Sequence, residues 1–262
     1  MSIYEYQPML AFFVIVAVVF GAVMGSFLNC AAWRIAHGES FVKGRSHCPE
    51  CGHTLGALEL IPVLSYVIQR GRCKACGTKL SVRYPITELV FSGITVICLL
   101  RFDLTVLCLR NYFFLCCLFV LFFTDLDDMI IPDGCHIVSI AAWVITQPFL
   151  FTGWTDTLLS VAAAFLFGGG LLGVSLVMDR VLGRDSLGGG DIKLFFVIGL
   201  YLGMIGTLFT MMLACIVGLI IHALSKGREK SREFPFGPSI AAAAAAMLLF
   251  GQPLISWYGS LI

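Results

Sequence analysis

Long apolar stretches, separated by short polar ones, make up most of this chain. Residues 6–33 contain no Asp, Glu, Lys or Arg, and this predicts a first membrane span near 9–29. A polar stretch follows at 34–83, and the apolar pattern then returns in segments of helical length (84–100, 111–124, 134–153, 157–178, 194–225 and 239–262). A helix needs about 20 largely apolar residues to cross a bilayer. The pattern therefore predicts an all-α polytopic membrane protein with one polar insertion.

The segment 194–225 is too long for a single span, since an α-helix rises about 1.5 Å per residue. Gly199, Gly203 and Gly206 lie near its middle, where a tight hairpin would turn. We predict two spans here, which gives about eight transmembrane helices in total. Seven is the alternative, with this segment as one long helix.

Composition supports a membrane protein. Apolar residues make up 59% of the 262, only 13% are charged, and the mean hydropathy is +0.94, whereas soluble domains carry about a quarter charged residues. A disordered chain, a secreted disulfide scaffold and a nucleic-acid-binding protein are excluded as descriptions of the whole chain. The first apolar segment is not expected to be a cleaved signal peptide, because no basic region precedes it and it is too long.

The basic residues predict the orientation of the chain. With the N-terminus outside, the cytoplasmic segments hold fifteen of the 17 Lys and Arg (34–83, about 125–133, 179–193 and 226–238). Only Arg101 and Arg110 remain outside. Because cytoplasmic loops of membrane proteins are enriched in Lys and Arg, we expect the insertion and the acidic loops to face the cytoplasm.

The polar insertion contains two Cys-x-x-Cys pairs. Cys48 and Cys51 are separated by 21 residues from Cys73 and Cys76, and each pair is followed by a glycine. This spacing is typical of a four-thiolate structural zinc site, and cytoplasmic thiols are kept reduced. His47 or His53 could replace a cysteine, and a redox pair or chance is the remaining alternative. So small a loop is expected to need its metal in order to fold.

Two acidic clusters lie at predicted membrane boundaries. One runs from Thr124 to Asp133, and the other is Gly-Gly-Gly-Asp at 188–191. Each alone is compatible with simple helix capping. Together, on one face of the bilayer and at similar depth, they suggest a pair of carboxylates. Such a pair shares a proton, so that one member can activate water for attack on a peptide carbonyl while the other protonates the leaving amine.

These motifs resemble those of the bacterial type IV prepilin peptidases, which are intramembrane aspartyl proteases of the GxGD class. The resemblance covers nearly the whole chain, through GSFLNCAAWR, GRSHCPECG, LIPVLSY, GRCKACG, RYPITE, TDLDDMIIPD, GGGDIKL and PFGPSIA. The chain departs from the family at Ala36, where proline is usual, and at 56–59, where a Trp-containing stretch is usual. Neither departure touches the aspartate motifs; both bear on methyl transfer, which the family assigns to this N-terminal region.

The resemblance implies that Asp125 and Asp191 are catalytic, with Asp127 as the alternative to Asp125. It implies cleavage of a basic leader peptide after a glycine, at the cytoplasmic face of the bacterial inner membrane. It also implies N-methylation of the new N-terminus with S-adenosylmethionine. The expected partners are prepilin or pseudopilin precursors and membrane lipid, with no nucleic acid. Apart from the resemblance, Asp133 follows Pro132 and is expected as the N-cap or a first-turn residue of the next helix.

The sequence leaves the methyl-donor site unknown, because no glycine-rich nucleotide fingerprint is present. Glu39 and Glu88 are candidates for the base that methyl transfer requires. Glu88 has an equally good structural explanation, in the first turn of the second span or paired with Arg83 or Lys79. The expected domains are a first span (1–33), a zinc domain (34–83) and a transmembrane protease core (84–262).

Three other functions are open at this point. A proton-coupled transporter also has acidic residues and glycine-broken helices within the membrane. Against it, both aspartates are expected at the cytoplasmic edge rather than near the midplane, and the halves show no internal repeat. A methyltransferase without peptidase activity and a structural assembly platform are the remaining alternatives.

Overall fold

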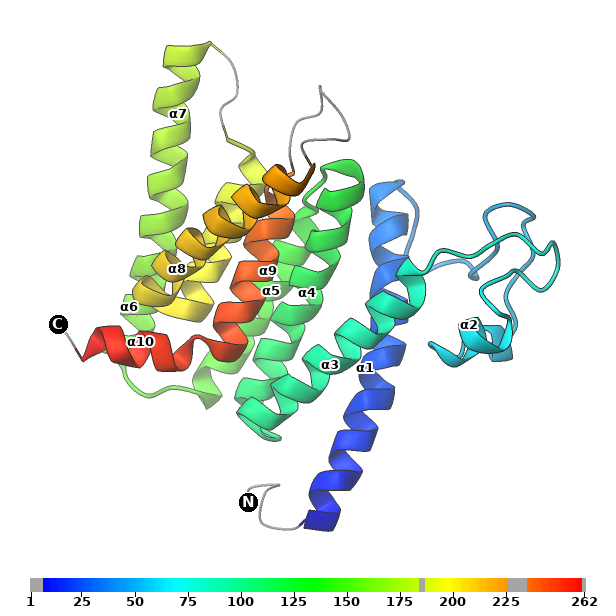
Figure 1. The fold of residues 1–262 in the computed structure, drawn as a ribbon. Helices are drawn as coiled ribbons and strands as arrows, with labels where there is room; N and C mark the ends of the chain where they lie inside the picture. The colour runs from blue at the N-terminus through cyan, green and yellow to red at the C-terminus, as the bar shows by residue number, and fades with distance from the viewer. Residues whose placement is uncertain (1–6, 184–186, 226–234, 261–262) are drawn as a thin grey trace. The chain divides into compact units, whose positions relative to one another are not determined.

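The structure is a computed structural model that describes residues 7–183, 187–225 and 235–260. The described residues form helices and their connections (Figure 1), with two isolated β-bridges and no β-strand among them. The all-α prediction is confirmed. Five basic residues that contributed to the predicted orientation lie outside the described residues (Arg184, Lys226, Arg228, Lys230 and Arg232).

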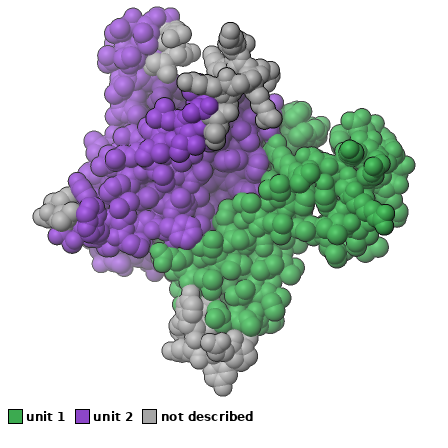
Figure 2. Space-filling model, viewed as in Figure 1, with its two compact units in different colours: residues 1–108 green, residues 109–262 purple. Residues whose placement is uncertain are grey.

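The chain divides into two compact units, residues 1–108 and 109–262 (Figure 2). The first unit contains α1 (Gln7–Ala36), η2 (Ala57–Leu60), α2 (Leu64–Ile68), α3 (Arg83–Phe102) and the start of α4 (Val106–Asp128). Helices α1 and α3 pack closely because α1 carries a glycine at the contact. A Cβ atom on Gly21 would lie 2.6 Å from Oγ1 of Thr95. The hydroxyl of Ser92 also donates a hydrogen bond to the carbonyl of Val18 (2.9 Å).

The second unit includes the remainder of α4, whose side chains from Phe114 to Asp125 are nearly all buried. It contains α5 (Asp133–Thr146), η3 (Gln147–Phe149), α6 (Trp154–Ala164), the π-helix η4 (Phe165–Gly169), α7 (Gly170–Leu182), α8 (Gly189–Ser225), α9 (Gly237–Phe250) and α10 (Gln252–Gly259). A glycine again sets the closest packing, because a Cβ on Gly199 of α8 would lie 2.5 Å from Cα of Ala164.

Helix α8 is broken at Gly203, which has a φ of +64°. A Cβ on Gly218, beyond the break, would lie 3.1 Å from the ring of Phe236, just before α9 begins. Asp191, before the break, interacts with Asp125, which itself contacts Gly237 at the start of α9. In a straight helix, Asp191 and Gly218 would lie about 40 Å apart. The chain therefore reverses at Gly203, within the predicted hairpin, and both ends of α8 lie toward the top of Figure 1.

Several described helices are long and apolar enough to cross a membrane, so the chain is a multi-pass membrane protein. By length and composition there are five among the described residues (Met9–Ala36, Arg83–Phe102, Val106–Asp128, Trp154–Leu182 and Gly189–Ala223), or six if α9 and α10, bent by 77°, form one broken span. The predicted count of eight is not confirmed by this criterion. Helix α5 has only 14 residues, because Pro148 follows and the chain continues as η3.

Candidate active site

Asp125 lies in the last turn of α4 and is only 5% exposed. Its neighbour Thr124 is buried as well and satisfies its hydroxyl by donating to the carbonyl of Val120 (3.1 Å). The helix ends at Asp128, three residues after Asp125, and the next residue, Met129, adopts a φ of +54° and donates its N–H to the carbonyl of Asp125 (3.1 Å). This placement turns the Asp125 side chain into the second unit rather than toward water.

Gly237, the first residue of α9, faces the Asp125 carboxylate. A Cβ atom at position 237 would lie 2.6 Å from Oδ2 of Asp125, so any larger residue would displace the acid. The same Oδ2 is buried, and no hydrogen-bond partner for it occurs among the described residues. The sequence placed Gly237 within a family motif but gave it no role, and the structure shows that it makes the space in which Asp125 sits.

Asp191 lies in the first turn of α8, where its N–H donates to the carbonyl of Gly188 (3.1 Å). The preceding glycines allow a close approach to the segment that follows α4. A Cβ on Gly190 would lie 2.6 Å from Cβ of Ile131, well inside the usual contact distance. The glycine motif therefore brings the start of α8 against the chain just beyond Asp125.

The two aspartates are close enough for the charge of Asp125 to act on Asp191. Oδ1 of Asp191 resembles Oδ2 of Asp125 in being buried, with no hydrogen-bond partner in the described part of the chain. Buried polar atoms in proteins are normally hydrogen-bonded, so such exceptions need an explanation. Two neighbouring carboxylates do not ionise together easily, and a pair that holds one proton can act as acid and base at once.

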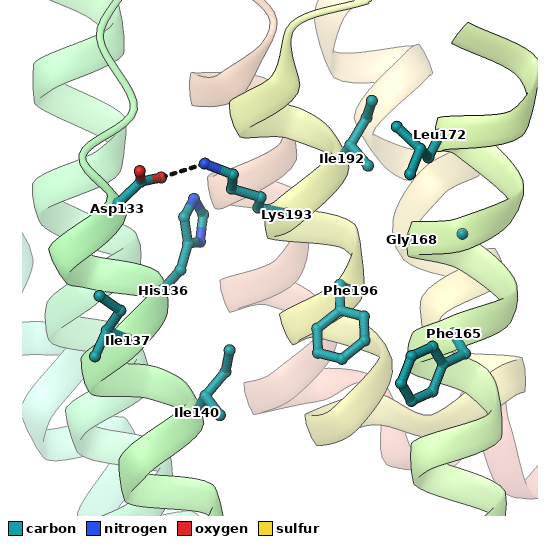
Figure 3. A pocket seen from close by; sticks show the side chains of 11 residues that line it. Asp133, His136, Ile137, Ile140, Phe165, Gly168, Leu172, Ile192, Lys193 and Phe196 are labelled. Atoms are coloured by element: carbon teal, nitrogen blue, oxygen red, sulfur yellow. Dashed lines mark hydrogen bonds and ion pairs between the residues drawn. The ribbon is translucent and has the colours of Figure 1, made fainter. Parts of the chain in front are cut away.

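The other acids of the first cluster lie elsewhere. Asp127 and Asp128 are exposed, as expected for the loop end of the helix. Asp133 is the first residue of α5, which agrees with its predicted first-turn position. Its carboxylate forms an exposed ion pair with Lys193 of α8 (2.6 Å), which neutralises the charge of Asp133 (Figure 3).

A cavity of about 510 Å³ lies between α5, the π-helix η4 with α7, and α8 (Figure 3). The Asp133–Lys193 pair lies at one end, and most of its remaining lining is apolar (Ile137, Ile140, Phe165, Leu172, Ile192 and Phe196). His136 also lines it and is 5% exposed, and no partner for its Nε2 occurs among the described residues. No motif marks this cavity in the sequence, because its residues come from three separate segments.

The four cysteines of the insertion lie together, as predicted. Their Sγ atoms all lie within 4.8 Å of one another, and those of Cys48 and Cys76 are 4.0 Å apart. Zinc–sulfur bonds of about 2.3 Å in a tetrahedron place sulfur atoms about 3.8 Å apart. The arrangement therefore fits a four-thiolate zinc site.

The two cysteine pairs have the same backbone conformation. In the first, Gly52 (φ +71°) donates its N–H to the carbonyl of Cys48, and in the second, Gly77 (φ +73°) donates to Cys73, both at 2.9 Å. Each pair is closed by one isolated bridge between the flanking residues. This repetition explains why a glycine follows each pair, since only glycine adopts positive φ without strain.

His53 is engaged outside the cysteine cluster. Its Nε2 lies 3.2 Å from Oε2 of Glu59, which also accepts the N–H of Gly56 (2.8 Å). The Gly56 N–H, with help from His53, holds the pKa of the Glu59 carboxyl below its ordinary value. Glu59 thus connects the stretch 56–59, where the chain departs from the family, to His53, two residues after Cys51.

The two candidate bases for methyl transfer differ in their surroundings. Glu39 is exposed just after α1. Glu88 is buried near the start of α3, where its Oε2 accepts the N–H of Val63 (2.7 Å). Because Val63 has an unfavourable φ of +60° for a β-branched residue, this bond fixes a strained position just before α2. Glu88 therefore has a structural contact, but not the predicted one: α3 begins already at Arg83, so Glu88 lies beyond its first turn, and its carboxylate accepts from Val63.

Comparison with known proteins identifies the family. Residues 19–102 match the model of the bacterial peptidase A24 N-terminal domain, and residues 112–223 match the model of the type IV leader peptidase family. The second match contains both Asp125 and Asp191. No solved structure matches the chain.

Relatives confirm this over most of the chain. A prepilin leader peptidase/N-methyltransferase of Bacillus subtilis (strain 168) is 35% identical over 246 residues, which are 92% of this chain and 95% of that protein. A protein of the same name from Myxococcus xanthus (strain DK1622) is 34% identical over 88% of this chain and 70% of its own length. One from Aeromonas salmonicida (strain A449) is 30% identical over 83% of this chain and 75% of its own length. The chain belongs to the type IV leader peptidase family.

The Glu88–Val63 bond leads to a testable prediction about the insertion. Glu88→Ala leaves the Val63 N–H without its acceptor, which costs about 1–3 kcal/mol. We expect limited proteolysis between residues 57 and 70 to become about tenfold faster in detergent. Glu88→Gln is the matched control, because it keeps an acceptor oxygen at this position. Equal proteolysis of all three proteins would show that the bond does not hold this segment.

Proposed function

We propose that this protein is an intramembrane aspartyl endopeptidase that removes the basic leader from type IV prepilin-like precursors. Cleavage follows a glycine at the cytoplasmic membrane face, and Asp125 and Asp191 are the catalytic residues. The observation that carries the proposal is the pair of neighbouring carboxylates, each with a buried oxygen that has no partner among the described residues. The family match and the names of the relatives support the substrate class.

The pair supplies both proton transfers that peptide hydrolysis needs. The ionised carboxylate takes a proton from water as its oxygen attacks the scissile carbonyl, while the protonated carboxyl donates a hydrogen bond to the carbonyl oxygen. The tetrahedral intermediate then collapses, the C–N bond breaks, and the leaving amine receives a proton from the pair. Asp125 and Asp191 belong to separate helices, α4 and α8, and each has one buried oxygen without a partner among the described residues.

The proposed topology has eight passes, with the N-terminus outside in the bacterial inner membrane. The passes are α1, α3, α4, α5, the continuous α6–α7, the two parts of α8 and the broken α9–α10. The reversal at Gly203 supports counting α8 twice. Asp125 ends one helix and Asp191 begins another, so both lie near a membrane boundary. A transporter, whose charges would lie near the midplane, is not supported.

We also propose that the protein methylates the new N-terminal amine. The relatives are named N-methyltransferases, which implies a methyl donor such as S-adenosylmethionine. When bound, that donor supplies an electrophilic methyl group. The chain must supply a base that removes the ammonium proton, and the exposed Glu39 fits this role better than Glu88, which is engaged with Val63.

Zinc held by Cys48, Cys51, Cys73 and Cys76 is proposed as a structural ion. Four thiolates leave no open coordination position, so the ion stabilises the insertion rather than activating water. The short η2 and α2 helices have no fully buried residues, which leaves the insertion with little core of its own. The segment 34–83 is then a zinc domain, the preceding residues are the first span, and 84–262 form the protease core in contact with membrane lipid.

Replacement of either catalytic aspartate tests the peptidase proposal. Asp125→Asn or Asp191→Asn replaces one of the two ionisable acids by an amide, and we expect cleavage of a synthetic prepilin in detergent to fall at least about 10³-fold. Asp127→Asn and Asp128→Asn are matched controls in the exposed part of the cluster and should stay within about twofold of wild type. Thermal unfolding confirms that each variant is folded, and wild-type cleavage by either site variant would refute the assignment.

Metal content tests the zinc proposal. Wild-type protein is expected to contain about one zinc ion per chain by elemental analysis, and Cys48→Ser or Cys73→Ser should lose nearly all of it. The insertion of these variants should also become sensitive to protease, because metal binding stabilises its fold. Cys215 is an exposed residue of α8, and the Cys215→Ser protein should keep its zinc. A zinc-free wild-type insertion that resists protease would contradict the proposal.

A further inference from the structure

Two cysteines outside the insertion form a close pair at the turn between α3 and α4. The Sγ atoms of Cys98 and Cys108 lie 3.8 Å apart. The Sγ of Cys98 lies 3.9 Å from the carbonyl oxygen of Cys108, and the Sγ of Cys108 lies 3.8 Å from the carbonyl oxygen of Cys98. Both residues belong to the first compact unit. Neither has a role in the proposed peptidase or zinc sites.

The turn itself holds this pair in register. The Thr105 hydroxyl donates to the carbonyl of Phe102 (2.7 Å) and accepts the N–H of Cys108 (3.2 Å). Asp103 ends α3 with a φ of +54°, which reverses the chain within three residues. A disulfide has an S–S bond of about 2.05 Å and tolerates only a narrow range of Cβ separations. The turn brings the two sulfurs into contact at 3.8 Å, so the bond forms when side-chain rotation closes the remaining gap.

The two cysteine groups lie at opposite ends of α3. The helix begins at Arg83, shortly after Cys76, and runs for 20 residues to Phe102. Twenty residues of α-helix span about 30 Å, the thickness of the hydrocarbon core. If the insertion is cytoplasmic, the turn with Cys98 and Cys108 is on the outer side. Disulfides form and persist outside the cytoplasm, whereas cytoplasmic thiols stay reduced.

We infer that Cys98 and Cys108 are oxidised to a structural disulfide on the outer face of the membrane. The inference rests on the proposed topology but not on the peptidase activity. The bond closes the α3–α4 corner, from which α4 runs toward Asp125. Cys98 and Cys108 are then a modification site. The oxidant that reacts with them is a disulfide-bearing protein of the cell envelope.

The oxidation proceeds by two thiol–disulfide exchanges. Cys108 is partly exposed whereas Cys98 is fully buried, so Cys108 reacts first. Its thiolate attacks one sulfur of the oxidant disulfide, which gives a mixed disulfide and releases one oxidant thiolate. The Cys98 thiolate then attacks the Cys108 sulfur and releases the second. The cysteine pair loses two electrons and two protons, and the oxidant becomes a dithiol.

Sequential thiol labelling of the full chain tests this inference. Membranes from a bacterium whose envelope contains a dithiol oxidase are quenched in acid, denatured in detergent and treated with N-ethylmaleimide. They are then reduced and treated with a maleimide of different mass, and peptide mapping shows which label each cysteine carries. We expect the second label on Cys98 and Cys108, and the first on Cys48, Cys51, Cys73 and Cys76. In Cys98→Ser, Cys108 should take the first label, whereas the control Cys215→Ser should leave the pair oxidised.

Each other outcome overturns the inference in a recognisable way. The first label on both Cys98 and Cys108 of the wild-type protein would show that the pair is reduced, and would leave the peptidase proposal intact. The second label on the four insertion cysteines, with the first on Cys98 and Cys108, would show an inverted chain. That result would overturn the proposed topology together with the disulfide. A bridge from either residue to another cysteine would refute the pairing.

Discussion

The constraint on which the second unit depends is the placement of a buried acid, Asp125, near a half-buried one, Asp191. Burial of an acid is costly in free energy, and a like charge beside it adds to that cost. The fold keeps Asp125 and Asp191 together through close contacts that only glycine permits, at Gly190 and Gly237. Each acid has one buried oxygen for which the described residues offer no partner. The same arrangement that is unfavourable for stability is the one that the proposed peptide hydrolysis requires.

Features that depend on short-range pattern were predictable from the sequence. Spans follow from apolar length, and the cysteine cluster follows from two Cys-x-x-Cys pairs with a glycine after each. The break at Gly203 falls within the predicted hairpin because positive φ favours glycine. The first-turn position of Asp133 follows from the proline before it. In each case the physical cause lies within a few residues of its effect.

Features that depend on tertiary contact were not predictable in this way. Nothing in the pattern distinguishes Gly237 from other glycines, and its role appears only when α9 meets Asp125. The bond from Glu88 to Val63 joins residues 25 apart and gives the carboxylate a partner that the sequence did not predict. The count of spans also depends on context, because α5 has only 14 residues and α8 folds back on itself.

Proximity of the two aspartates can be measured without reference to activity. Asp125→Cys/Asp191→Cys protein is treated in membranes with a short bifunctional thiol reagent, and the cross-linked peptides are mapped by mass spectrometry. Asp127→Cys/Asp191→Cys protein is the comparison, since Asp127 lies on the exposed end of the same helix. The account predicts a bridge between positions 125 and 191 and little or none from 127. A bridge from 127 alone would contradict it.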